Sequence, residues 1–71
     1  MNLTNALAKR EYTISAVKTD VEELNSFLFS LGCYSGEKIA VTKHNRSGCI
    51  VLIKDAKYSI DIPLAKAILI E

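Results

Sequence analysis

The stretch that organises this chain is Asp20–Gly36, DVEELNSFLFSLGCYSG. Asp20 followed three residues later by Glu23 matches a capping box, the side-chain pattern that satisfies free amides at the start of a helix. Gly32 follows the last apolar residue of the stretch, where a left-handed glycine commonly ends a helix. We therefore predict one short helix capped by Asp20 and ended at Gly32, with a second turn at Gly36 that leads into a strand.

This helix is predicted to be amphipathic. At about 100° per residue, five apolar side chains share an arc roughly 120° wide, which we expect to be the buried face. They are Val21, Leu24, Phe27, Leu28 and Leu31. Phe29 lies off this arc, and Cys33 is expected to fold back on Leu28 in a Schellman ending. The helix should therefore bury one face and leave Phe29 outside it.

The residues on both sides of the helix have β-strand patterns. Before it, Tyr12–Lys18 is rich in β-forming residues, and its alternation fails near Ser15–Ala16, which predicts a bulge. After it, we predict three hairpin-linked strands, one helical turn and a last short strand. These span Lys38–His44, Cys49–Lys54, Lys57–Ile62, Pro63–Lys66 and Ala67–Ile70. A link at Asp55–Ala56 joins the second and third of these strands.

Five short strands in a chain of 71 residues are too few for a two-sheet sandwich that also carries a helix. They can close into a small SH3-like barrel, which removes most exposed strand edges. We therefore predict a mainly β fold with one helix, which lies between the first and second strands and plugs one end of a five-stranded barrel. Residues 1–71 form a single domain, with Tyr58, Ile60 and Ile62 facing its interior.

Charge and hydropathy exclude several classes of function. Nine basic and eight acidic residues give a net charge of +1, which argues against a general binder of nucleic acid or anionic membrane. The N-terminus lacks the apolar segment of a signal peptide, and the longest apolar run, Cys49–Ile53, is too short to cross a bilayer. We therefore expect a cytoplasmic protein with two reduced thiols and no membrane insertion.

No combination of side chains predicts catalysis or metal binding. A zinc site needs three or four ligands at recognisable spacing, whereas Cys33, His44 and Cys49 are the only soft or borderline ligands here. A nucleophile needs a positioned base and usually an orienting acid, and no acidic residue lies near His44 in sequence. We therefore predict no catalytic residue, no metal ligand, no cofactor and no enzymatic activity.

Two groups of residues are candidates for contact with a partner. Lys43, His44 and Arg46 form a basic hairpin loop that could meet a phosphate or an acidic surface, although charged hairpin tips are commonly just solvated. Phe29 and Tyr34 are neighbouring aromatic residues outside the predicted core, as contact anchors often are. A lone exposed phenylalanine is also ordinary, so both interpretations of Phe29 stay open.

Three motifs, in this order and spacing, resemble the FeoA family of ferrous iron transport protein A domains. Leu31–Gly36 is similar to the family's L-G-x-x-x-G, Glu37–Val41 to the strand that follows it, and Ala65–Ile70 to the ending A-x-x-I-x-V. Two departures concern glycines: Lys9–Glu11 has none before the first strand, and Asp55–Ala56 replaces one that is common in the family. The resemblance spans nearly the whole chain.

The resemblance implies a non-enzymatic accessory or regulatory protein of ferrous iron uptake. Its implied partner is the ferrous iron permease FeoB, whose cytosolic part is a GTP-binding domain. We expect the contact to be made by the corner between helix and strand and by the neighbouring loops. An SH3-like regulatory or adaptor domain, as in iron-dependent repressors, is one alternative. A small-barrel binder of nucleic acid is another, but it would need exposed aromatic platforms, and Tyr12 and Tyr58 are both assigned inward. The oligomeric state stays open.

Overall fold

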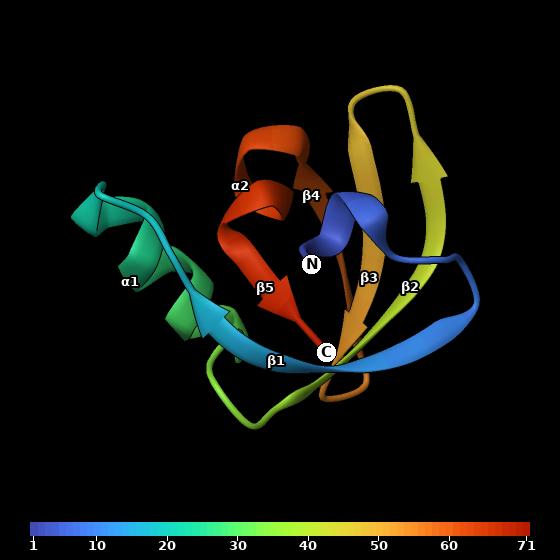
Figure 1. Ribbon diagram of the computed structural model, residues 1–71, viewed down its shortest axis with the longest axis horizontal. Helices are drawn as coiled ribbons and strands as arrows, with labels where there is room; N and C mark the ends of the chain where they lie inside the picture. The colour runs from blue at the N-terminus through green and yellow to red at the C-terminus, as the bar shows by residue number, and fades with distance from the viewer.

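Five antiparallel β-strands curve around a single core in the computed structural model, which describes all residues from 1 to 71 (Figure 1). The strand order in the sheet is β4-β3-β2-β1-β5. In chain order the elements are a 3-10 turn η1 (Leu3–Asn5), β1 (Arg10–Val17), α1 (Glu22–Leu31), β2 (Lys38–Asn45), β3 (Gly48–Ile53), β4 (Ala56–Asp61), α2 (Ile62–Ala67) and β5 (Ile68–Ile70). The predicted mainly β, five-stranded fold is confirmed, with α1 between the first two strands and a second, shorter helix near the end of the chain.

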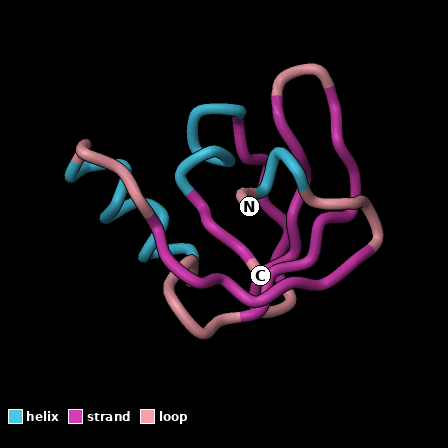
Figure 2. Tube along the Cα trace, in the orientation of Figure 1, coloured by secondary structure: helices cyan, strands magenta, loops and turns pink.

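A bulge in β1 allows this one strand to pair with two neighbours. Its first half, Arg10–Thr13, pairs with β2, and its second half pairs with β5. The register shifts between Ile14 and Ala16, which confirms the predicted bulge. β4 and β5 are the outer strands and are joined by α2 rather than by a ladder (Figure 2). Ile62 was expected to face inward, but it begins α2 and is 39% exposed.

The core contains fifteen buried apolar or thiol side chains in one cluster. Alternate residues of β2 and β3 point into it, including Ile39, Val41 and Val51, and both Ile68 and Ile70 of β5 are buried as predicted. Six core residues come from outside the strands: Leu3, Ala6, Leu28, Cys33, Ala65 and Ala67. The N-terminal turn and α2 pack against each other, so they fill space that the helix α1 was expected to occupy.

The helix α1 projects from the side of the barrel and does not plug its end (Figure 1). Leu28 is its only fully buried residue, and Leu24 and Leu31 are half-buried. Val21 and Phe27, also assigned to the buried face, are 47% and 48% exposed. The predicted buried face is therefore wrong at those two positions, because other elements fill the interior of the barrel. Neither helix reaches the length and apolarity that crossing a bilayer requires.

The two ends of α1 differ in how well the sequence predicted them. The predicted Asp20 cap is wrong: the N-cap residue is Val21, which has extended backbone angles and makes no side-chain capping bond. The other end forms the predicted Schellman ending, with Gly32 at φ 98° in the left-handed region. There the amide of Cys33 donates to the carbonyl of Leu28 at 2.9 Å, which brings Cys33 into the core.

Three residues other than glycine have left-handed backbone angles. Lys54 and Asp55, at φ 49° and 67°, form the two-residue turn between β3 and β4, so the predicted link at Asp55–Ala56 is one residue too late. Lys9, at φ 65°, precedes β1. Lys9 and Asp55 therefore lie in the two segments where the family resemblance leads one to expect glycine.

Candidate partner-binding surface

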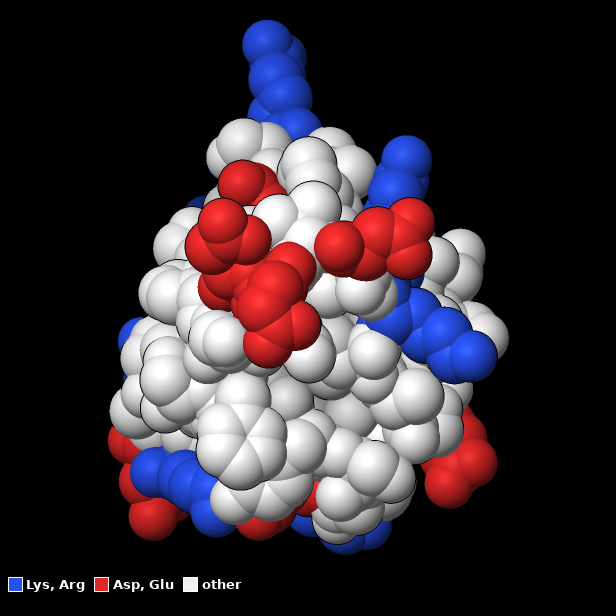
Figure 3. All heavy atoms as spheres, turned by 90° about the vertical axis from the view of Figure 1, so that its left-hand side faces the viewer, with Lys and Arg blue, Asp and Glu red and all other residues white.

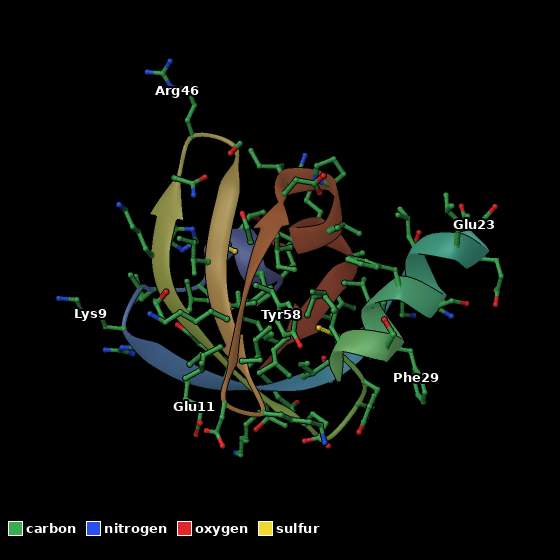
Figure 4. The ribbon with its side chains drawn as sticks, turned by 180° about the vertical axis from the view of Figure 1, so that it is seen from behind. Lys9, Glu11, Glu23, Phe29, Arg46 and Tyr58 are labelled. Carbon is green, nitrogen blue, oxygen red and sulfur yellow. The ribbon has the colours of Figure 1, made fainter.

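An aromatic pair lies at the end of α1, formed by the exposed Phe29 and the half-buried Tyr34. Phe29 is 64% exposed and points away from the barrel (Figure 4), and its ring centroid lies 5.0 Å from that of Tyr34. The Lys54 ammonium lies 5.5 Å from the centroid of the Tyr34 ring, within the range of a cation–π contact. We call Phe29, Tyr34 and Lys54 the aromatic corner. It places two tilted aromatic rings beside a positive charge.

Lys54 is also tied to the loop before β2. Its Nζ lies 2.9 Å from Oε1 of Glu37. The hydrogen bond from Lys54 is the main reason why the pKa of Glu37 is lowered, and Glu37 in turn raises the pKa of Lys54. The pair lies at the surface, with side chains 53% and 31% exposed, so water screens much of its attraction. Its main effect is to fix the position of Lys54 over Tyr34.

The aromatic pair separates two grooves. The helix–β1 groove, about 580 Å³, lies between α1 and the end of β1, and the hairpin groove, about 420 Å³, lies between α1 and the β3–β4 turn. The side chains of Phe29 and Tyr34 line both grooves. The helix–β1 groove is completed by Ser15, Ala16, Val17, Glu22, Asn25, Ser26, Cys33 and Ser35. The hairpin groove is completed by Ser30, Leu31, Gly32, Ile53, Lys54 and Tyr58.

The first turn of α1 is acidic. Glu22 and Glu23 are exposed in this turn, Asp20 precedes them, and the helix contains no lysine or arginine. Seen from the side of α1, acidic side chains gather in the upper part of the face, above a broad area without charge (Figure 3). The surface around α1 therefore combines an acidic end with an aromatic end.

The predicted basic residues lie on a different part of the molecule. Lys43 and His44 are on β2, and Arg46 lies at the tip of the β2–β3 hairpin, well away from Phe29 (Figure 4). His44 has a structural contact, because its Nε2 donates to the carbonyl oxygen of Ala6 at 2.6 Å. The five candidate contact residues thus form two separate surfaces, the aromatic corner and the basic hairpin.

Both thiols are part of the core. Cys33 and Cys49 are 2% and 1% exposed, and burial raises the pKa of Cys33 to about 11 and also raises that of Cys49. A thiol is a nucleophile or a metal ligand as its thiolate, which burial disfavours. No three histidine, cysteine, aspartate or glutamate side chains lie close enough together to hold a metal ion.

A barrel of five short strands, flanked by a helix and open to solvent through shallow grooves, defines a small SH3-like domain. The model of the FeoA domain matches residues 1–71, and the chain therefore belongs to the FeoA family. No curated protein matches the chain.

Solved structures show the same fold over the whole chain. A protein described as an iron uptake regulatory protein (FeoA) has a TM-score of 0.90 at 17% identity, with 95% of its chain covered. Stenotrophomonas maltophilia FeoA complexed with zinc, described as a procaryotic SH3 domain protein, has a TM-score of 0.86 at 17% identity, with 89% covered. ScaR with bound Zn²⁺ has a TM-score of 0.86 at 20% identity, with 36% of its chain covered.

Proposed function

We propose that this protein is a non-enzymatic accessory of ferrous iron uptake that binds the cytosolic domain of a FeoB-type permease through the aromatic corner. The observation that carries the proposal is the placement of the Phe29 side chain, which is 64% exposed yet packs against Tyr34 between two grooves. Aromatic anchors of this kind, next to pockets, contribute most to many protein interfaces. Family membership supports the iron uptake context, since relatives are described as an iron uptake regulatory protein and as a possible ferrous iron transport activating factor.

The chemistry of the polar and thiol groups supports a binding role over catalysis. Cys33 and Cys49 are buried, and the imidazole of His44 is hydrogen-bonded to Ala6. A binding protein regulates a transporter by preferring one of its conformations, and a tenfold preference shifts that equilibrium by about 1.4 kcal/mol. We therefore propose that the domain acts on the permease by state-selective binding in the cytoplasm.

The basic hairpin is proposed as a second contact. Lys43 and Arg46 are exposed, and Arg46 at the tip of the β2–β3 hairpin lies well away from Phe29 (Figure 4). Exposed charges outside the centre of a contact steer the encounter, so they act mainly on the association rate and its salt dependence. Replacing both by alanine should therefore slow association severalfold at low salt and change the dissociation rate little. His44 lies beside them and also fastens the N-terminal segment.

The test is a calorimetric titration of the protein with the purified cytosolic domain of the permease, in its nucleotide-free, GDP-bound and GTP-analogue-bound forms. Phe29→Ala and Tyr34→Ala should each weaken binding at least tenfold. Phe27→Ala is the matched control, because Phe27 is on the same helix, is 48% exposed and lines neither groove. The proposal is overturned if no form of the domain binds, or if the two corner variants bind as tightly as the control.

A second candidate function is that of an SH3-like regulatory or adaptor domain, as in iron-dependent repressors, acting here as a separate protein on such a repressor. The similarity to ScaR, of which this chain covers 36%, favours it. In that case titration with the iron-dependent repressor of the same cell should give binding that Phe29→Ala weakens, whereas the permease domain should give none. The two candidates are therefore distinguished by which of the two purified partners binds.

A further inference from the structure

The second half of β1 has one free edge. Ile14 makes the last hydrogen bonds toward the β2 side, donating to Glu37 and accepting from Gly36, both at 2.8 Å. On the β5 side, Thr13 exchanges two bonds with Glu71, and Lys18 donates to the carbonyl of Ala67 at 2.8 Å. Beyond Ile14 the β2 side of β1 therefore has no strand beside it, and the helix–β1 groove lies there.

Val17 presents its main-chain groups to this free edge. In an antiparallel ladder, residues that bond to a neighbouring strand alternate with residues whose amide and carbonyl point away from it. Val17 is paired with Ile68 in register, and the bond from Lys18 to Ala67 flanks it, so the amide and carbonyl of Val17 point away from β5. The groove thus has a main-chain donor and acceptor on one wall, as sheet edges that accept an added strand do.

The opposite wall of the groove is one face of α1. Glu22, Asn25, Ser26 and Phe29 line it, spaced as neighbours along a helix face. Phe29 follows Glu22 by seven positions, which is about 10.5 Å along the axis at 1.5 Å per residue. An extended peptide advances about 3.3 Å per residue, so three residues of it cover the same length. The groove therefore has a carboxylate at one end and an aromatic ring at the other, within reach of one short segment.

We infer that the helix–β1 groove binds a short extended segment of a partner protein, pairing with the main chain of Val17 and carrying a lysine or arginine beside a large apolar residue. Glu22 recognises the cation, while Phe29 and Tyr34 contact the apolar side chain. The inference rests on the proposed docking function and names the chemistry of what is docked.

Charge complementarity selects this occupant. The groove is lined by the carboxylate of Glu22 and by no cation, and Asp20 and Glu23 add negative charge around the same end of α1. Lys18 is the only basic residue between Ser15 and Ser35, and it does not line the groove. The free groups of Val17 select an extended segment over a helix, because a helix has already bonded its own main chain.

The test uses a phage-displayed library of random seven-residue peptides, selected against the whole protein and followed by NMR titration of synthetic copies of the selected peptides. Selected sequences should combine lysine or arginine with a large apolar residue, and binding should slow hydrogen exchange of the Val17 amide at least tenfold. Glu22→Lys should weaken the affinity for these peptides at least tenfold. Glu23→Lys is the matched control: it reverses a neighbouring charge in the same helical turn but does not line the groove, and it should change affinity less than threefold.

Two results would overturn the groove assignment: selection that yields no binding peptide, and peptides whose affinity responds equally to Glu22→Lys and Glu23→Lys. The same two variants, titrated with the permease domain, separate this inference from the docking proposal. If the protein binds the permease domain, and Glu22→Lys binds it with the same affinity as Glu23→Lys, the groove assignment fails and the docking proposal stands. If the peptides bind as described but the domain does not, the permease proposal fails and the groove assignment stands.

Discussion

The rings of Phe29 and Tyr34 lie 5.0 Å apart because the left-handed turn at Gly32 folds the chain back on the end of α1. The same turn pairs Leu28 with Cys33, whose amide donates to the Leu28 carbonyl, and both side chains are buried. Leu28 and Cys33 thus anchor the corner from inside, and the next residue of each, Phe29 and Tyr34, forms its outer surface. The helix ending that stabilises the fold therefore also builds the proposed contact site.

The aromatic pair should be energetically coupled. In a double-mutant cycle with Phe29→Ala, Tyr34→Ala and the double variant, we expect a coupling free energy of about 0.5–1.5 kcal/mol, as for aromatic pairs in general. Phe29→Ala alone should cost less than about 1.5 kcal/mol because its side chain is largely exposed. Urea unfolding followed by circular dichroism measures all four proteins. Strictly additive effects would mean that the two rings contribute no mutual stabilisation.

Two apolar positions on α1 should differ sharply in their effect on stability. Leu28→Ala should lower the free energy of unfolding by about 2–5 kcal/mol, because Leu28 is fully buried in the core. Phe27→Ala, one position earlier and 48% exposed, should cost less than about 1.5 kcal/mol. The comparison is made by urea unfolding. Equal losses would mean that α1 buries its other face in solution.

The sequence predicted where α1 lies and how it ends better than which side of it is buried. The ending is local, because Gly32 and the bond from Cys33 to Leu28 need only neighbouring residues. Which face of α1 is buried depends on what fills the barrel. The periodicity of the helix alone does not show that the N-terminal turn and α2 fill that space instead. The groove was also not predictable. The main-chain groups of Val17 face a free edge only because β1 pairs on its other side with β5, about fifty residues later.

Left-handed residues in place of glycine are sites for stabilising substitutions. Lys9→Gly should raise the free energy of unfolding by up to about 1 kcal/mol. A residue with a side chain is strained by roughly 1–2 kcal/mol at φ 65°, and glycine removes this strain. Glycine also makes the unfolded chain more flexible, which offsets part of the gain. The Lys9 amide still donates to the Val41 carbonyl in the variant. Thermal unfolding gives the change in stability.

The control for this substitution is Lys43→Gly, which removes the same side chain from within β2, where the backbone is extended. It should lower the free energy of unfolding by roughly 0.5–1 kcal/mol, since glycine weakens the interior of a strand. Opposite signs at the two lysines would identify backbone conformation as the cause. A loss of stability in Lys9→Gly as well would show that the Lys9 side chain contributes more than its strained backbone costs.

The ion pair between Glu37 and Lys54 should make stability depend on pH at both extremes. Because folding lowers the pKa of Glu37 from its ordinary value of 4.5, its contribution is complete above pH 4.5 and is lost as the pH falls through the folded pKa. Because folding raises the pKa of Lys54 from 10.5, its contribution is complete below pH 10.5 and is lost as the pH rises beyond the folded value. The difference in Tm between the protein and Glu37→Gln should therefore be constant near neutral pH and shrink at acidic pH. Glu11→Gln, at an exposed residue without an ion pair, controls for the loss of one negative charge, and a difference that stays constant through acidic pH would rule out this pair as the cause.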